Sequence, residues 1–151
     1  HQREVLYKEI TEQAICYSVA RASVAEIDQY NILQSTMMAM RRAVIALKTQ
    51  PDFVAVDGNR LPTWEYKAEA VVKGDGRVEV ISAASIIAKV VRDAEMVAFD
   101  AKYPGYGFAK NKGYGTAQHM EALKRLGATP IHRRSFAPVS ENLLPEQQLL
   151  L

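Results

Sequence analysis

Two aspartates, Asp57 and Asp75, stand at the ends of short apolar runs of the chain, 53–56 and 70–72, and a glycine follows each of them. Short apolar runs that stop at such a turn are typical of buried strands, and ligand sites in open α/β sheets collect at the carboxyl ends of strands. On neighbouring strands, the two carboxylates would offer hard oxygen ligands to Mg²⁺ or Mn²⁺. Asp-Gly is also a common turn dipeptide, so a purely structural role for both aspartates stays open.

The segment that follows Asp75 predicts a helix with a phosphate-binding face. Two hydroxyls and two cations recur at 3-4-3 spacing and therefore share one side of that helix: Ser82, Ser85, Lys89 and Arg92. Hydroxyl donors and cations are the groups that contact phosphate oxygens in nucleic-acid complexes. The same pattern would also describe the solvated side of an amphipathic helix.

A glycine-rich segment, 102–115, combines aromatic and cationic side chains. Aromatic faces interleaved with cations suit nucleotide stacking and phosphate neutralisation. In a second interpretation, Tyr103 and Phe108 pack beneath the loop and only the lysines are exposed, and we expect a mixture of the two. A further basic cluster follows at His132-Arg133-Arg134-Ser135. A lone histidine is more often structural than catalytic, but the two neighbouring arginines suit phosphate contact.

The positive charge is concentrated in one block of the chain. The whole sequence has a formal net charge of +2, whereas residues 101–140 carry seven lysines and arginines against one glutamate. Such a block favours a polyanionic partner, although a basic solvated surface remains the alternative.

Composition excludes several classes of protein. A chain of 151 residues that is 48% hydrophobic and 24% charged has a globular balance. One cysteine allows no intrachain disulfide and no Cys/His zinc set, which favours a reducing, cytoplasmic compartment. The apolar runs are too short to span a membrane, and we expect neither a signal peptide nor a membrane partner.

The periodicity predicts an α/β layered domain over 1–140 and a C-terminal tail over 141–151. The sheet is thin for this class. The expected elements are a helix over 2–14, a strand over 15–20, a short helix over 23–27 capped by Ser23, a long helix beginning at Asn31, strands over 53–56 and 70–72, a helix over 80–103, a loop to 115, a helix capped by Thr116 that stops at Gly127, and an extended remainder.

Five motifs, taken in order, resemble bacterial ribonuclease HII over residues 2–139. They are Val-Asp57-Gly-Asn-Arg, Lys-Gly-Asp75, Ile81-Ser-Ala-Ala-Ser-Ile-Ile-Ala-Lys89, Lys112-Gly-Tyr114-Gly-Thr and His132-Arg-Arg-Ser-Phe136. The resemblance implies a helix-rich ribonuclease H-like fold. It also implies an endonuclease that hydrolyses the RNA strand of RNA–DNA hybrids and cuts on the 5′ side of ribonucleotides in duplex DNA, leaving a 3′-hydroxyl and a 5′-phosphate.

The resemblance also implies roles for particular residues. Asp57 and Asp75 correspond to the third and fourth members of a four-carboxylate site for Mn²⁺ or Mg²⁺. Tyr114 corresponds to the tyrosine that packs at the RNA–DNA junction and helps to sense the 2′-hydroxyl. The other residues expected at the nucleic acid are Ser82, Ser85, Lys89, Lys112, His132 and Arg133.

One part of the family pattern has no counterpart in the chain. The family's opening strand carries an Asp-Glu pair followed by Gly-Arg-Gly, and nothing here matches either motif. We therefore expect an amino-terminally truncated member with an incomplete sheet that is inactive alone, binds duplexes through residues 101–140, and tends to self-associate through its exposed sheet edge. The alternative is a non-catalytic nucleic-acid-binding module in which both aspartates are turn residues.

Overall fold

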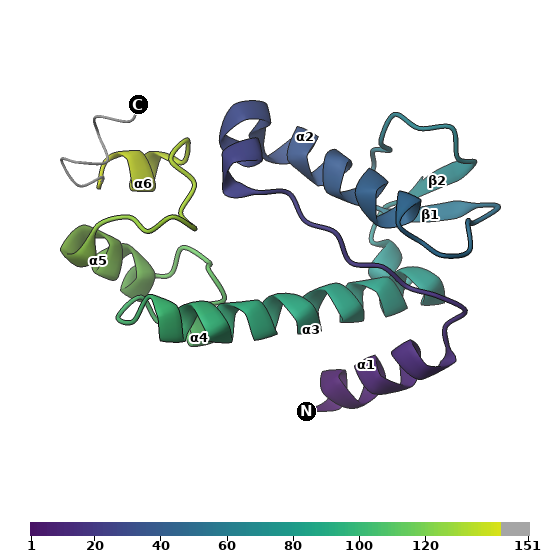
Figure 1. Ribbon diagram of the computed structural model, residues 1–151, viewed down its shortest axis with the longest axis horizontal. Helices are drawn as coiled ribbons and strands as arrows, with labels where there is room; N and C mark the ends of the chain where they lie inside the picture. Colours follow the sequence, from purple (N-terminus) through teal and green to yellow (C-terminus); the bar gives the residue numbers. More distant parts are fainter. Residues whose placement is uncertain (143–151) are drawn as a thin grey trace. The chain divides into compact units, whose positions relative to one another are not determined.

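The computed structural model describes residues 1–142 as a helix-rich chain with one small sheet (Figure 1). In chain order the elements are α1 (Gln2–Gln13), α2 (Val24–Ile45), β1 (Val54–Asp57), β2 (Ala68–Val71), the 3₁₀ helix η1 (Gly74–Gly76), α3 (Glu79–Lys102), α4 (Phe108–Asn111), α5 (Ala117–Leu126) and α6 (Ala137–Ser140). Among the described helices, none is both long and apolar enough to cross a bilayer.

The chain divides into two compact units. Unit 1 comprises His1–Ala22 and Leu33–Val91, and unit 2 comprises Ser23–Ile32 and Arg92–Leu151. Helices α2 and α3 each contribute to both units. The predicted boundary between a domain over 1–140 and a tail over 141–151 stays a prediction, because residues 143–151 of that tail lie outside the described residues.

The first helix matches its prediction, but the strand expected after it does not form. Helix α1 ends at Gln13, and residues 15–20 have no regular structure. A strand is stable only where a neighbour accepts and donates its backbone hydrogen bonds, and the sheet of the described residues contains β1 and β2 alone. Ile15 is accordingly 90% exposed. The prediction of a strand over 15–20 is therefore wrong.

Helix α2 begins with a reciprocal cap and is broken once, as expected from Ser23 and Asn31. The Ser23 hydroxyl accepts a hydrogen bond from the Glu26 amide (3.1 Å), and the Glu26 carboxylate accepts one from the Ser23 amide (2.8 Å). At Asn31 the backbone leaves the helical region, with φ 74° and ψ 169°. Helical hydrogen bonding cannot continue through this conformation, so the break falls where the sequence places its second cap.

The two strands pair in parallel, with Val54 opposite Ala68 and Asp57 opposite Val71. Their bounds lie within two residues of the predicted runs. Parallel pairing puts the carboxyl ends of both strands at one edge of the sheet. At this edge the amide of Gly58 donates a hydrogen bond to the carbonyl of Val71 (3.0 Å), which extends the ladder by one step.

A tight turn follows β2 and leads into α3. Lys73 adopts a left-handed conformation (φ 54°), and η1 follows at once. Gly74 is buried there, and a Cβ at this position would lie 2.6 Å from Cδ1 of Ile81 and 3.3 Å from Cβ of Val71. The absence of a side chain at position 74 therefore lets η1 approach the start of α3 and the end of β2.

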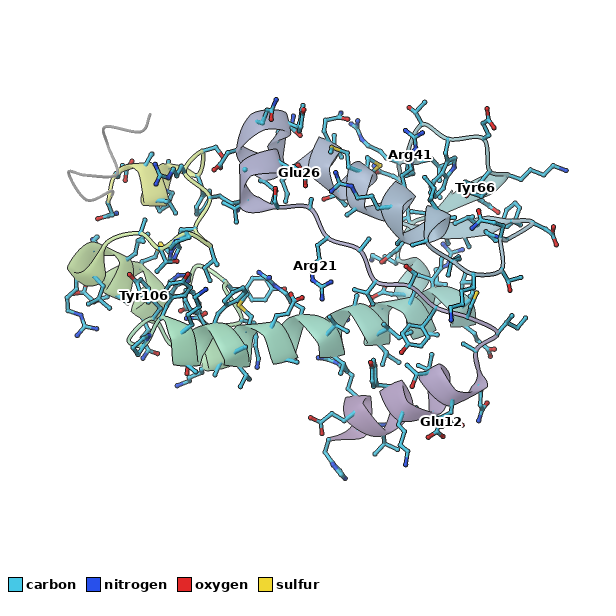
Figure 2. All side chains as sticks on the ribbon, in the orientation of Figure 1. Glu12, Arg21, Glu26, Arg41, Tyr66 and Tyr106 are labelled. Carbon is cyan, nitrogen blue, oxygen red and sulfur yellow. The ribbon has the colours of Figure 1, made fainter. Side chains whose placement is uncertain are left out.

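The core of unit 2 is built from aromatic rings. Tyr106 and Phe108 stack at 5.3 Å between ring centroids, and Met96 and Ala122 pack with them. The hydroxyl of Tyr106, labelled in Figure 2, donates to the carbonyl of Gly127 (2.6 Å). This bond connects the segment between α3 and α4 to the end of α5.

The C-terminal half of the chain differs from the prediction in two places. The segment expected as loop contains α4, and the remainder expected as extended contains α6. Both are single helical turns, which are too short to show a hydrophobic period. Helix α5, by contrast, begins as predicted at Thr116, whose hydroxyl accepts from the amide of His119 (3.2 Å), and stops at Gly127 with φ 78°.

Two histidines complete the core of unit 2. His119 and His132 are 4% and 8% exposed, and their rings pack against Tyr106 and Phe108. Burial, and to a smaller degree the neighbouring His119, lowers the pKa of His132 from 6.5 to about 4. Between about pH 4 and pH 6.5 this ring is therefore mostly neutral in the folded protein and mostly protonated in the unfolded chain.

Replacing Gly74 by alanine should destabilise the protein by about 1–2 kcal/mol, because the new methyl group overlaps Ile81 and forces its side chain to shift. Gly76→Ala is the matched control, since nothing lies within 4 Å of a Cβ at that position. Urea unfolding of the two variants measures the difference. Equal destabilisation by both substitutions would contradict the close approach at Gly74.

Acid should destabilise the protein in a window set by His132. Its folded pKa (about 4) lies below its unfolded value (6.5), so the unfolded chain binds the extra proton between these values. Stability should be complete above pH 6.5 and decrease as the pH falls toward 4, by about 2 kcal/mol. Urea unfolding between pH 7.5 and pH 4.5 measures this dependence. His132→Gln is the control, and its free energy of unfolding should change less with pH than that of the unaltered chain. A flat profile for the unaltered chain would contradict it.

Candidate functional site

The carboxylate of Asp57 is held at the carboxyl edge of the sheet. Asp57 is the last residue of β1, and its Oδ1 accepts a hydrogen bond from the amide of Gly74 (2.8 Å). Gly74 directly precedes Asp75 in η1. The bond therefore joins the end of β1 to the turn that carries the second aspartate, across seventeen positions of the sequence.

Asp75 is exposed in the middle of η1, and Ser82 secures this turn from α3. The Ser82 hydroxyl approaches the backbone carbonyls of Asp75 and Val78, the latter at 3.2 Å. Its proton is therefore engaged within the protein, and Ser82 acts on the turn rather than offering a free donor to phosphate. Ser85 is half-buried and Lys89 is exposed further along α3.

These two carboxylates fit a hard divalent cation by their chemistry. Carboxylate oxygens are preferred ligands of Mg²⁺ and Mn²⁺, and both side chains are exposed with room for coordinated water. Over residues 1–142, however, no group of three or more His, Cys, Asp or Glu side chains is placed to hold a metal ion. Two carboxylates fit one weakly held ion and carry too little charge to offset the repulsion between two.

Unit 2 presents Tyr114 on a tightly bonded loop. The Tyr114 amide donates to the carbonyl of Asn111 (2.9 Å), and its own carbonyl accepts from the Thr116 amide (2.9 Å) and from Nδ1 of His119 (2.8 Å). The turn before it depends on positive φ at Lys112 (55°) and Gly113 (84°). The backbone of Tyr114 is thus bonded on both sides, while its side chain is 75% exposed.

The other aromatic residues of this segment are less accessible than Tyr114. Tyr106 and Phe108 belong to the core, and Tyr103 is half-buried with the ammonium of Lys102 5.4 Å from its ring centroid. The expected mixture of packed and exposed aromatic residues is confirmed, with Tyr114 as the exposed ring. Lys112 is half-buried beside it.

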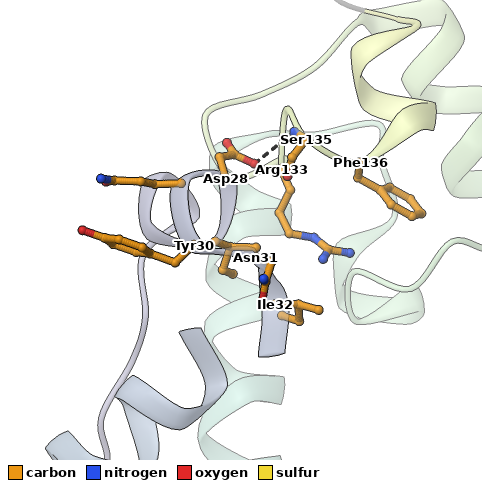
Figure 3. Close-up of a pocket in the computed structure, with 9 residues that line it drawn as sticks. Asp28, Tyr30, Asn31, Ile32, Arg133, Ser135 and Phe136 are labelled. Carbon is orange, nitrogen blue, oxygen red and sulfur yellow. Dashed lines mark hydrogen bonds between the residues drawn. The ribbon is translucent and has the colours of Figure 1, made fainter. Parts of the chain in front are cut away.

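The basic cluster at 132–134 divides into a buried and an accessible part. His132 is buried, and both of its ring nitrogens are hydrogen-bonded within unit 2. A direct contact between His132 and nucleic acid stays a prediction, and in this structure both ring nitrogens already have partners within the protein. Arg133 lies with its guanidinium 5.0 Å from the Phe136 ring centroid and lines a pocket of about 370 Å³ (Figure 3).

Asp28 organises this pocket and was not expected from the sequence. Its carboxylate accepts hydrogen bonds from the amides of Arg134 (3.2 Å) and Ser135 (3.0 Å) and from the Ser135 hydroxyl (2.6 Å). Burial raises the pKa of Asp28, but these hydrogen bonds and the charge of Arg133 outweigh it and hold the pKa below its usual value. A negative Asp28 fixes the chain next to Arg133.

The sequence analysis assigned no role to three more residues, which are Gly74, Asn111 and His119. Gly74 acts through its amide, and Asn111 acts through its buried side chain, which bonds the Tyr106 carbonyl (2.7 Å) and the Gly113 amide (2.8 Å). His119 had one available signal, since it stands three residues after the Thr116 cap. That position identifies its amide as capped, but it says nothing about the ring.

Comparisons with known proteins point to one family. The sequence profile of the family described as Ribonuclease HII matches residues 1–139. The chain is 60% identical over 142 residues to a ribonuclease HII from Acidovorax sp. (strain JS42) and to one from Acidovorax ebreus (strain TPSY), covering 94% of this chain and 68% of each relative.

The fold has a solved counterpart as well. The structure superposes with a TM-score of 0.80 and 26% identity on the crystal structure of the ribonuclease H2 from Pyrococcus horikoshii OT3, over 93% of this chain and 74% of that one. The predicted ribonuclease H-like α/β fold is thereby confirmed. Ribonuclease HII proteins are endonucleases of the ribonuclease H type, which use divalent metal ions and act on RNA–DNA hybrids. The profile match and the identity to its relatives establish that this chain belongs to the ribonuclease HII family.

Proposed function

We propose that Asp57 and Asp75 are two of the metal-binding carboxylates of this endonuclease. Its substrates would be the RNA strand of RNA–DNA hybrids and duplex DNA with embedded ribonucleotides, cut on the 5′ side of the ribonucleotide. The observation that carries the proposal is the hydrogen bond from the Gly74 amide to Asp57 Oδ1 (2.8 Å), because it holds one carboxylate beside the turn that bears the other. Neither side chain is buried, so both can meet a phosphate group together with an ion.

Asp57 and Asp75 would do separate work in this site. Asp57 uses one oxygen to accept from Gly74 and keeps the other free for a ligand, so its orientation is set before a ligand arrives. Asp75 extends from a turn that Ser82 secures. A bound Mg²⁺ or Mn²⁺ would supply activation of water and stabilisation of the departing 3′-oxygen, which would leave a 3′-hydroxyl and a 5′-phosphate.

The nucleic-acid contacts would come from exposed side chains. Tyr114 offers an exposed aromatic face for stacking at the RNA–DNA junction, and Arg133 offers a guanidinium beside Phe136. The remaining proposed contacts are Ser85, Lys89 and Lys112. Because binding through cations releases counterions, we expect duplex affinity to fall steeply with salt.

A non-catalytic nucleic-acid-binding module remains the competing proposal for the 151-residue chain. The site of Asp57 and Asp75 favours the binding module in one respect, since over the described residues no third protein ligand joins these two carboxylates. The chain alone should therefore bind duplex without turnover. A cytoplasmic location, which the single cysteine favours, and self-association through the edges of a two-stranded sheet belong to the same set of proposals.

Asp57→Asn should weaken Mn²⁺ binding about tenfold or more, because the substitution removes one of two negative charges. The amide oxygen of asparagine still accepts from Gly74, so the fold should persist. Isothermal titration with Mn²⁺ measures the affinity, and Asp52→Asn, at an exposed position before β1, is the matched control. Unchanged Mn²⁺ affinity in Asp57→Asn would favour the binding module instead.

The 151-residue chain should not cleave a duplex that contains one ribonucleotide, even with Mn²⁺, since two carboxylates do not offset the charge of a two-ion site. A gel assay with a labelled duplex, alongside an active ribonuclease HII as the positive control, measures cleavage. Clear turnover that disappears in Asp57→Asn would refute the predicted inactivity and would strengthen the assignment of Asp57.

A further inference from the structure

A continuous line of hydrogen bonds crosses the core of unit 2 and ends at the backbone of Tyr114. The amide of Thr129 approaches Nδ1 of His132 at 2.9 Å, Nε2 of His132 lies 2.9 Å from Nε2 of His119, and Nδ1 of His119 lies 2.8 Å from the carbonyl oxygen of Tyr114. The two imidazoles are thus the middle members of a chain with a backbone group at each end.

The two ends determine the direction of every bond between them. A backbone amide can only donate, so Nδ1 of His132 must accept and the ring's hydrogen must sit on Nε2. A backbone carbonyl can only accept, so Nδ1 of His119 must donate and its Nε2 must be the bare nitrogen. The bond between the rings therefore runs from His132 to His119. Each ring carries one hydrogen and the pair is neutral.

Further contacts agree with this direction. With Nδ1 of His132 as acceptor, its one lone pair is shared between the Thr129 amide and the Thr129 hydroxyl, also at 2.9 Å, and the hydroxyl oxygen accepts from the Ile131 amide (3.3 Å). Both rings are nearly inaccessible and stand against Phe108 at 5.4 and 5.7 Å between centroids. An apolar surround of this kind disfavours a charged imidazole and keeps water from competing for the ring nitrogens.

The end point of the chain is the residue with the most exposed ring in its loop. The Tyr114 carbonyl takes two donors, from His119 and from the Thr116 amide (2.9 Å), and the Tyr114 amide bonds to Asn111 (2.9 Å). Only the side chain is left free, 75% exposed. The bonds on its own backbone therefore set the position and direction of the Cα–Cβ bond from which this ring projects, and the histidine pair supplies one of them.

We propose that His119, oriented by His132, is a positioning residue that fixes the backbone of Tyr114 and so aims its ring at the ribonucleotide-containing duplex. This inference rests on the proposed contact between Tyr114 and nucleic acid. It also gives His132 a role that agrees with its burial.

The tautomers of the two histidines are the first test, and they need no substitution. Long-range ¹H–¹⁵N correlation spectra of the 151-residue chain at pH 7.5 should show the hydrogen of His119 on Nδ1 and that of His132 on Nε2. The opposite tautomer at either ring, or a protonated ring at this pH, would overturn the directional chain whatever the role of Tyr114.

A pair of substitutions at His119 separates positioning from packing. The side-chain nitrogen of asparagine lies near the Nδ1 position of histidine, and that of glutamine near the Nε2 position. His119→Asn therefore keeps a donor for the Tyr114 carbonyl and His119→Gln removes it. Fluorescence anisotropy measures the affinity of each variant for a duplex with one ribonucleotide and for the same duplex in all-DNA form, and circular dichroism verifies folding.

The expected result is a loss confined to the ribonucleotide-containing duplex. Tyr114→Ala and His119→Gln should each weaken its binding about fivefold or more, whereas His119→Asn should stay within about twofold of the unaltered chain. If Tyr114→Ala has no effect, the proposed contact of Tyr114 fails. If Tyr114→Ala weakens binding but His119→Gln does not, the positioning role fails. It also fails if both His119 variants bind the ribonucleotide-containing duplex and the all-DNA duplex more weakly by the same factor. Should His119→Gln not fold, the tautomer spectrum and His119→Asn decide the question.

Discussion

The hydrogen bond between the Gly74 amide and the Asp57 carboxylate is the interaction on which the candidate metal site depends. It connects the end of one parallel strand to the turn that follows the other, although β1 and β2 are separated by ten residues of loop. It also requires a residue without a side chain at position 74, because Ile81 and Val71 occupy the space that a Cβ would need. The hydrogen bond to Asp57 and the close packing against Ile81 and Val71 thus both depend on the backbone of Gly74.

Unit 2 follows the opposite electrostatic design. Here the groups that could carry charge in the core are neutral imidazoles, and the lysines and arginines are left at or near the surface. Because the pKa of the buried His132 is near 4, the core does not hold a charged imidazole that it could not solvate. The positive charge of residues 101–140 comes instead from the lysines and arginines, which can meet a polyanion. The one carboxylate that organises this region, Asp28, is satisfied by three donors from residues 134 and 135.

Local signals predicted the elements whose ends are chemically marked. Ser23, Thr116 and Gly127 act at helix ends as their residue types suggest, and Asn31 breaks α2 where the second cap was expected. The failures have a common cause. Residues 15–20 have a β-prone composition but no neighbouring strand in the described chain, and α4 and α6 are too short to leave a periodic pattern.

The sequence by itself determined the family and the two apolar strands, because motifs, apolar runs and turn residues are local properties of the sequence. That the two strands pair in parallel came from the tertiary structure. Only the tertiary structure decided what each side chain does with its hydrogen bonds. It turned Ser82 toward the backbone of η1, buried His132 against His119, and left Tyr114 as the exposed ring of its loop. Those outcomes depend on partners far away in the sequence, and a donor or acceptor has no fixed role until its partner is in place.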